Sequence, residues 1–206
     1  MIDLTSLAIT ALAFFVVAVS PGPANISNAA VAMSFGRRTS LVYGTGLSCG
    51  LVFWGLVAAS GMGAVLQGSL YVLIVLKLLG GLYLLWLAWQ SGRSAMRPAA
   101  DKVPLPSKGR WFWRGLILNL SNPKSVIAWM AALSVGLGPD DGLASVVAAT
   151  VVCIAAGFIN NVLYSLLFSV SGMMTGYRSF RRWIDGVVAG LFALAGLGLI
   201  KSAFAR

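Results

Sequence analysis

Six long apolar stretches follow one another along this chain of 206 residues, with little polar sequence between them. Each has about the 20 residues that a helix needs to cross the hydrocarbon core of a bilayer. With 59% apolar and only 10% charged residues, the chain has too little polar surface for a soluble domain. We therefore expect an all-α membrane protein with six transmembrane helices. The approximate spans are 4–32, 40–65, 69–92, 111–137, 143–170 and 184–204.

Basic residues fall in alternate connections between these spans. The first, third and fifth connections contain Lys or Arg, whereas the second and fourth contain none. By the positive-inside rule, the basic connections face the cytoplasm and both termini lie outside the cytoplasmic (inner) membrane. The net charge of +10 is then a topology signal and a contact for anionic lipid, not a nucleic-acid surface. The residues are Arg37 and Arg38; Arg93, Arg97, Lys102, Lys108 and Arg110; and Arg178, Arg181 and Arg182.

Prolines interrupt the first and fourth spans near their middles, in Ser20-Pro21-Gly22-Pro23 and Ser121-Asn122-Pro123-Lys124. A proline removes one backbone donor and displaces the carbonyl four residues before it. In a bilayer no water satisfies the groups that are released, so something polar must bond them. Discontinuous helices at corresponding places in two halves are typical of a transporter with its substrate site near the membrane midplane.

The chain also carries a weak internal repeat. A shift of one hundred positions places Pro23 on Pro123, Ala32 on Ala132, Ser34 on Ser134 and Gly36 on Gly136. Three spans separate equivalent segments, so the halves cross the membrane in opposite directions and form two inverted three-helix repeats. We expect one transmembrane domain over residues 1–206, with repeats at about 1–95 and 111–206 and a cytoplasmic linker at about 96–110, where Pro98, Pro104 and Pro106 stop both helices.

Lys124 is the most informative single residue. An isolated charge near the bilayer centre costs about 2.5–3.5 kcal/mol on insertion scales, so it should face a cavity or a partner. We expect no Asp or Glu in the membrane interior. Lys124 would then bond a released carbonyl, such as that of Asn119, or a substrate carboxylate; the structural alternative is a lysine that only bonds backbone oxygens at the kink. Lys77, two turns into the third span, is close enough to the outer surface to snorkel, and structural and functional roles both stay open.

Asparagines gather at the breaks and in the fifth span. An amide offers two donors and an acceptor, which suits the ammonium and carboxylate groups of a zwitterion, although bonding between helices is the simpler explanation for any one of them. The candidate substrate-binding residues are Pro21, Gly22, Pro23, Asn25, Asn122, Pro123, Lys124 and Asn161, with Lys77 and Asn160 as candidates for a coupling or structural role.

Two other classes of function are open. Cys49 and Cys153 occupy roughly equivalent places in the two halves and could relay electrons by thiol–disulfide exchange, although buried free cysteines usually act as small apolar residues. An inorganic cation exporter is disfavoured on the expectation that the spans lack acidic and histidine ligands. The chain has no histidine and no Walker-type loop, so we expect no enzyme, no metal and no cofactor.

The motifs together resemble the lysine exporter family, LysE/RhtB, which includes threonine and homoserine efflux proteins, over nearly the full length. They are the first break, Gly36-Arg37-Arg38, the third-span run from Leu76-Lys77 to Trp86-Leu87, and Asn119-Leu120-Ser121-Asn122-Pro123-Lys124. The resemblance implies six membrane helices and export of amino acids or their derivatives, generally driven by the proton gradient.

One departure from that family bears on the substrate. Members often carry an aspartate in the fifth span, where this chain has Asn160-Asn161, with Asn161 the closer equivalent; an acidic residue that some members place in the second span is replaced by Ser48-Cys49-Gly50. A lysine or arginine side chain would enter the membrane without a counter-charge. We therefore expect a neutral zwitterion such as threonine or homoserine.

Overall fold

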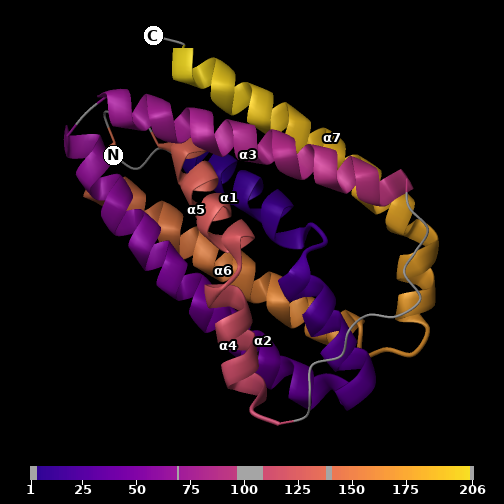
Figure 1. Cartoon of the computed structure of the whole chain (residues 1–206). Helices are drawn as coiled ribbons and strands as arrows, with labels where there is room; N and C mark the ends of the chain where they lie inside the picture. The colour runs from indigo at the N-terminus through magenta and orange to yellow at the C-terminus, as the bar shows by residue number, and fades with distance from the viewer. Residues whose placement is uncertain (1–3, 69, 97–108, 138–140, 205–206) are drawn as a thin grey trace.

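The computed structural model describes residues 4–68, 70–96, 109–137 and 141–204. Within these ranges the chain forms helices joined by turns and contains no strand, so the predicted all-α class is confirmed there (Figure 1). Most of the predicted linker 96–110, with its three prolines, lies outside the described residues. The helices are α1 (Leu4–Val19), α2 (Pro23–Gly68), α3 (Leu70–Met96), α4 (Trp111–Leu120), α5 (Pro123–Gly136), α6 (Leu143–Leu167) and α7 (Met173–Phe204).

Both predicted helix breaks are confirmed. The chain leaves α1 after Val19 and enters α2 at Pro23; in the second half it leaves α4 after Leu120 and enters α5 at Pro123. Each proline stands at the start of the new helix, where its missing N–H removes no helical hydrogen bond. The breaks divide the first and fourth predicted spans into short pieces that point into the protein.

The expected connection between the first two spans is shorter than predicted. α2 continues through it and bends at Gly36, whose φ of 81° and ψ of 172° strongly favour glycine. Gly36 divides α2 into a short arm, residues 23–35, and a long arm, residues 37–68. The two arms fold back on each other, since the Ser40 hydroxyl donates to Asn28 Oδ1 at 2.8 Å.

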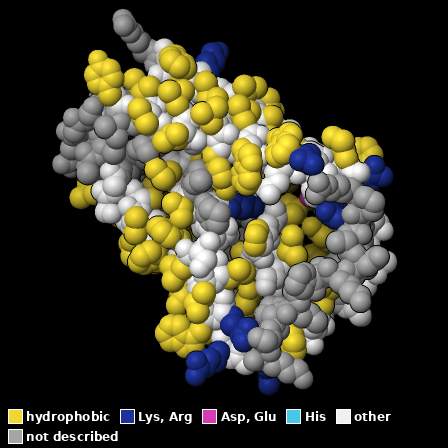
Figure 2. Space-filling view, viewed as in Figure 1, with side chains coloured by type: hydrophobic (Ala, Val, Ile, Leu, Met, Phe, Trp, Pro, Cys, Tyr) yellow, Lys and Arg dark blue, Asp and Glu magenta, His cyan; other side chains and the backbone are white. Residues whose placement is uncertain are grey.

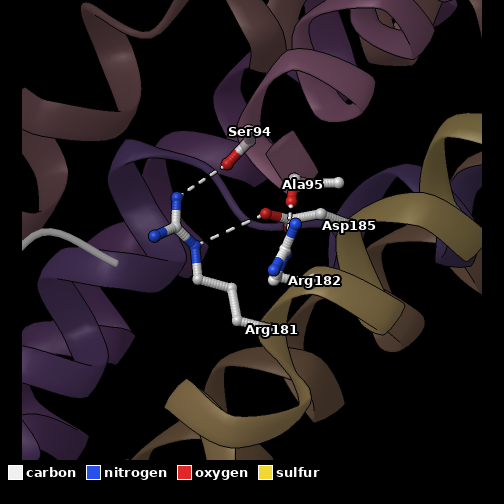
Figure 3. Close-up of polar contacts among 5 residues, drawn as sticks. All are labelled: Ser94, Ala95, Arg181, Arg182 and Asp185. Atoms are coloured by element: carbon white, nitrogen blue, oxygen red, sulfur yellow. Dashed lines mark hydrogen bonds and ion pairs between the residues drawn. The ribbon is translucent and has the colours of Figure 1, made fainter. Parts of the chain in front are cut away.

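α7 begins at Met173, well before the predicted 184. Contacts with the end of α3 account for the extra turns: Arg181 Nη2 donates to Ser94 Oγ at 2.8 Å, and Arg182 Nε donates to Ala95 O at 3.0 Å (Figure 3). These two arginines, expected in a loop, therefore lie on a helix.

The expectation of a membrane interior without carboxylates is wrong at α7. Asp185 lies within the apolar stretch Ser179–Phe204 and is only 1% exposed. It forms an ion pair with Arg181, with 3.4 Å between Arg181 Nε and Asp185 Oδ2 (Figure 3). The arginine on the same helix offsets part of the cost of burying this charge, and Oδ2 has no hydrogen-bond partner among the described atoms.

Two antiparallel helix pairs organise the bundle. α3 lies along α7, with Gly80 near Leu199 at one end and Ser94 bonded to Arg181 at the other (Figure 1). The long arm of α2 lies along α6 in the same antiparallel sense, because Ser48 contacts Asn161 while Leu51 contacts Gly157.

Glycines bring α4 and the long arm of α2 into backbone contact. A Cβ atom at Gly46 would lie 2.0 Å from Phe112 O, and one at Gly115 would lie 2.1 Å from Tyr43 O. No larger residue fits at either position, as is usual where small residues let membrane helices approach closely. This contact fixes α4, and with it the second break, against α2.

Three helical stretches among the described residues are long and apolar enough to cross a membrane: Pro23–Gly61, Leu143–Leu167 and Ser179–Phe204. Apolar side chains cover much of the face shown in Figure 2. α1, α4 and α5 are shorter because of the breaks. The chain is thus a helical membrane protein, and the six-span count stays a prediction.

Candidate functional site

A cavity of about 60 Å³ lies between the two helix breaks. Its walls come from α1, α2, α4, α5 and α6 and the two breaks. It has room for a few water molecules, since one water needs about 10–15 Å³ on this measure. Six of the residues singled out in the sequence line it: Gly22, Asn25, Asn122, Lys124, Asn160 and Asn161.

The first break is held together by side chains. The carbonyl oxygens of residues 17–20 each accept at least one side-chain hydrogen bond, because α1 ends here and Pro21 and Pro23 supply no N–H to the carbonyls of Val17 and Val19. The neutral donors are Ser20 Oγ to Val17 O at 2.7 Å, Asn25 Nδ2 to Ala18 O at 2.6 Å and to Ser20 O at 3.0 Å, and Tyr164 Oη to Val19 O at 2.9 Å. Two of these donors belong to the break itself, and Tyr164 comes from α6.

Lys124 connects the second break to the first. Its Nζ donates to Ser20 O at 3.0 Å and also to Ser20 Oγ. The partner is therefore a carbonyl of the opposite break rather than that of Asn119, whose oxygen accepts from the backbone N–H of Asn122 at 3.1 Å. A lysine that reaches across the cavity in this way holds the two halves of the chain together at the site.

The second break is satisfied mainly by its own chain. Ser121 N donates to Ile117 O at 2.9 Å, and Asn122 Oδ1 caps α5 by accepting from Lys124 N at 3.1 Å. One donor comes from elsewhere: Trp54 Nε1 on α2 bonds Leu120 O at 3.2 Å. The first turn of α5 is thus fixed by an ordinary N-cap.

The fifth-span asparagines complete the wall on the α6 side. Asn160 Nδ2 donates to Asn25 Oδ1 at 3.1 Å, and Asn161 Nδ2 donates to Ser48 Oγ at 2.9 Å. Asn161 also accepts through its backbone carbonyl from Asn28 Nδ2 at 2.9 Å. This side of the cavity is polar but uncharged.

Some predicted residues do not reach the cavity. Pro21 and Pro23 shape the first break without lining the cavity, and the side chain of Pro123 lies outside the description. Lys77 is half-buried on α3 and is not among the residues found around the cavity.

Two polar residues of the site were named at the breaks in the sequence but were not among the candidate binding residues. Ser20 is 1% exposed and receives Lys124; Asn119 is 3% exposed and lines the cavity. Asn119 Nδ2 donates to Leu47 O at 2.8 Å, but its Oδ1 is buried without a hydrogen-bond partner among the described atoms. Both residues adjoin a break in the sequence, and that proximity was the available signal.

The structure gives no support to the alternative functions. Cys49 is exposed on α2, whereas Cys153 is buried in an apolar cluster with Phe14 and Trp129. Among the described residues, no group of three or more His, Cys, Asp or Glu side chains could hold a metal ion.

The comparison with known families decides the class. Residues 15–203 match the family described as LysE type translocator. The chain belongs to this family. The resemblance seen in the motifs is therefore confirmed, and the protein is a membrane translocator whose relatives include amino-acid efflux proteins.

Named relatives are similar over much of the chain. The threonine efflux protein of Escherichia coli (strain K12) is 30% identical over 200 residues, which cover 93% of this chain and 96% of that protein. The homoserine/homoserine lactone efflux protein of Salmonella typhimurium (strain LT2) is 35% identical over 118 residues, 56% of each chain. No solved structure matches the chain.

Proposed function

We propose that this protein is a secondary-active exporter of neutral, zwitterionic amino acids, with threonine and homoserine as the leading substrates. The observation that carries the proposal is the amino group of Lys124 at a cavity between two broken helices. Two relatives bear the names of threonine and homoserine efflux proteins, which supports this choice of substrate.

The carboxylate of the substrate would bind at Lys124. α2 and α5 both begin at the cavity, at Pro23 and Pro123, and the N-terminus of a helix favours negative charge. The ammonium group would bind the oxygens of the first break and the amides of Asn25, Asn122 and Asn161.

The side chain of the substrate would be small and uncharged. Phe14 and Leu51 give the cavity an apolar wall, and the described residues that line it include no Asp or Glu. The unpartnered Oδ1 of Asn119 could accept a hydrogen bond from a substrate hydroxyl. A cationic side chain would lack a counter-charge, at a cost of about 2.5–3.5 kcal/mol, which corresponds to about a hundredfold preference for neutral substrates.

The transport cycle would rock one half against the other. The support for inverted repeats is that each half contains a broken helix followed by two further helical segments, and that corresponding helices pair antiparallel: α3 with α7, and the long arm of α2 with α6. A pseudo-twofold axis in the membrane plane relates equivalent helices in this way. The repeats would run over about 1–95 and 111–206.

Orientation and energy source complete the proposal. Figure 1 places the start of α1 and the end of α7 on one side, away from the bend of α2 and the start of α4, beside which Arg37, Arg38 and Arg110 lie in the sequence. With the basic side in the cytoplasm, both termini lie outside the inner membrane. We take protons as the coupling ion, as the family resemblance implies.

Efflux from proteoliposomes tests the proposal. Vesicles loaded with labelled threonine, homoserine, lysine or arginine are compared side by side, each with and without an imposed proton gradient. The expected result is gradient-dependent efflux of threonine and homoserine, with lysine and arginine about a hundredfold slower. Preferential efflux of arginine would contradict the substrate, and efflux that ignores every ion gradient would contradict the secondary-active mechanism.

A further inference from the structure

We propose that Lys124 competes with the substrate's ammonium group for the same two oxygens, the carbonyl and the hydroxyl of Ser20. Before substrate binds, the lysine occupies this ammonium subsite; the substrate carboxylate then draws the lysine away and the substrate ammonium replaces it. The inference rests on the proposed function, and it adds a subsite at Ser20 and the exchange that opens it.

Ser20 is built to accept hydrogen bonds from a primary ammonium group. Its hydroxyl proton is used on Val17 O at 2.7 Å, so the oxygen lone pairs are left to accept. Its carbonyl accepts from Lys124 Nζ at 3.0 Å. Both oxygens lie at the C-terminal end of α1, where the helix dipole favours a cation.

Among the described donors to the first break, Lys124 is the charged one and the one that an ammonium group can replace. Ser20, Asn25 and Tyr164 are neutral, and each bonds an α1 carbonyl that would otherwise be left unpaired. To displace one of them with an ammonium group would add an unbalanced charge to the site. To displace Lys124 exchanges one cation for another, since a substrate α-ammonium carries the same three N–H donors.

The exchange also keeps every charge paired. A zwitterion brings no net charge, and its carboxylate bonds the lysine that its ammonium displaces. Both cations therefore end with partners, which a membrane interior requires.

Gly22 gives the lysine room for this movement. A Cβ at Gly22 would lie 3.0 Å from Lys124 Nζ and 3.2 Å from Lys124 Cδ. The lysine side chain thus lies against Gly22, and Gly22 and Lys124 both line the cavity.

The proposal predicts that a compound with only one of the two charged groups of threonine binds poorly. 1-Amino-2-propanol, which is threonine without its carboxylate, cannot draw Lys124 away from Ser20. 3-Hydroxybutyrate, which is threonine without its amine, can draw it away but leaves the Ser20 oxygens unpaired.

Removal of the lysine should therefore raise the affinity for the amine. We would measure equilibrium binding of 1-amino-2-propanol and of threonine to the full-length protein in lipid nanodiscs, for the wild type and for Lys124→Met. The amine should bind the variant about tenfold more tightly than the wild type, the effect of freeing one charge-assisted subsite. Threonine should bind the variant at least about tenfold more weakly, because its carboxylate has lost the lysine.

The two affinities separate failure of this inference from failure of the proposed function. Unchanged or weaker amine binding, with weaker threonine binding, overturns the competition and leaves the proposed carboxylate site standing. Unchanged threonine binding overturns the carboxylate role of Lys124 itself. Lys124→Gln repeats the measurement with a polar side chain, in case methionine prevents folding.

Two controls test whether the higher affinity for the amine arises at Ser20. Lys201→Met removes an exposed lysine near the end of α7 and should alter neither affinity. Addition of Ser20→Ala to Lys124→Met removes one of the two acceptors and should reverse part of the gain for the amine. A gain that survives Ser20→Ala in full would place the amine elsewhere and overturn the subsite.

Discussion

The two helix breaks stand at corresponding positions in the chain, but their backbones are satisfied in different ways. At the second break the chain bonds itself, through Ser121 N and the Asn122 cap, with one bond from Trp54. At the first break the bonds described to the carbonyls of residues 17–20 come from side chains. The second break is thus held in place mainly by its own chain, whereas the carbonyl oxygens of the first break accept hydrogen bonds from side chains.

Residues one hundred positions apart show how the difference arises. Gly22 corresponds to Asn122, so one break has an open face where the other has a cap. Ala24 corresponds to Lys124, so only one break supplies a cation. Because the two breaks have diverged, they can bind a ligand whose two ends differ. The second half supplies the cation, and the first half supplies the oxygens that accept hydrogen bonds.

Lys124→Ala should have the largest effect. The protein should reach the membrane at wild-type levels but export no threonine, because the cation that links the breaks is gone. Efflux from proteoliposomes with matched protein content measures this, and Lys201→Ala, which removes an exposed lysine near the end of α7, should leave transport intact. Retained transport in Lys124→Ala would remove this lysine from the site.

Gly22→Ala should reduce efflux about tenfold, the loss of one charge-assisted contact. The added methyl would lie 3.0 Å from Lys124 Nζ, so the end of the lysine side chain must move by a few tenths of an ångström, which weakens its bonds to Ser20. Gly190→Ala on α7, where a Cβ meets nothing within 4 Å, is the matched control and should transport normally. Equal loss in the two variants would show that the contact at Gly22 has no special role.

Asn25→Ala and Asn122→Ala should destabilise the protein to different extents. Loss of the Asn25 amide leaves buried carbonyls short of a donor, at about 1–3 kcal/mol for each group affected. Loss of the Asn122 cap should cost about 1 kcal/mol, and Asn122→Ser should restore most of it. The thermal unfolding midpoints of the two variants in detergent measure the two losses of stability. A larger decrease for Asn122→Ala than for Asn25→Ala would contradict the difference drawn between the breaks.

Asn119→Leu should change selectivity more than transport. Its unpartnered Oδ1 would no longer accept from a substrate hydroxyl, so efflux of threonine should fall about fivefold relative to valine, consistent with the loss of one neutral hydrogen bond. Competition between the two labelled amino acids in one vesicle preparation measures the ratio. An unchanged ratio would show that Asn119 does not contact the substrate side chain.

Replacement of both cysteines should have the smallest effect. Cys49→Ser with Cys153→Ser should leave the threonine efflux rate unchanged, because neither thiol lines the cavity. Loss of transport at a normal protein level would instead favour a thiol relay.

The sequence predicted what its prolines and apolar spacing determine. Pro23 and Pro123 fixed where helices begin, since a proline dictates its own backbone geometry and removes its own donor. Lys124 could be placed at the site because a lone charge in an apolar span needs a polar surrounding. Both arguments are local and hold whatever the tertiary packing.

The sequence could not predict which groups meet across the fold. The bond from Lys124 to Ser20 joins residues far apart in the chain, and nothing near either residue specifies the pairing. The early start of α7 and the burial of Asp185 depend likewise on contacts with α3 and on the pairing with Arg181. These features come from tertiary packing, which residue patterns along one helix do not encode.

The central claim is that a substrate binds between the two breaks and that its ammonium group replaces Lys124 as the hydrogen-bond donor to the Ser20 oxygens. A structure of the full-length protein in lipid nanodiscs, determined with saturating threonine, tests it most directly. The account predicts threonine with its carboxylate within about 3 Å of Lys124 Nζ and its ammonium on the Ser20 oxygens, at ordinary hydrogen-bond distances. Threonine bound away from both breaks, with Lys124 still on Ser20, would contradict it.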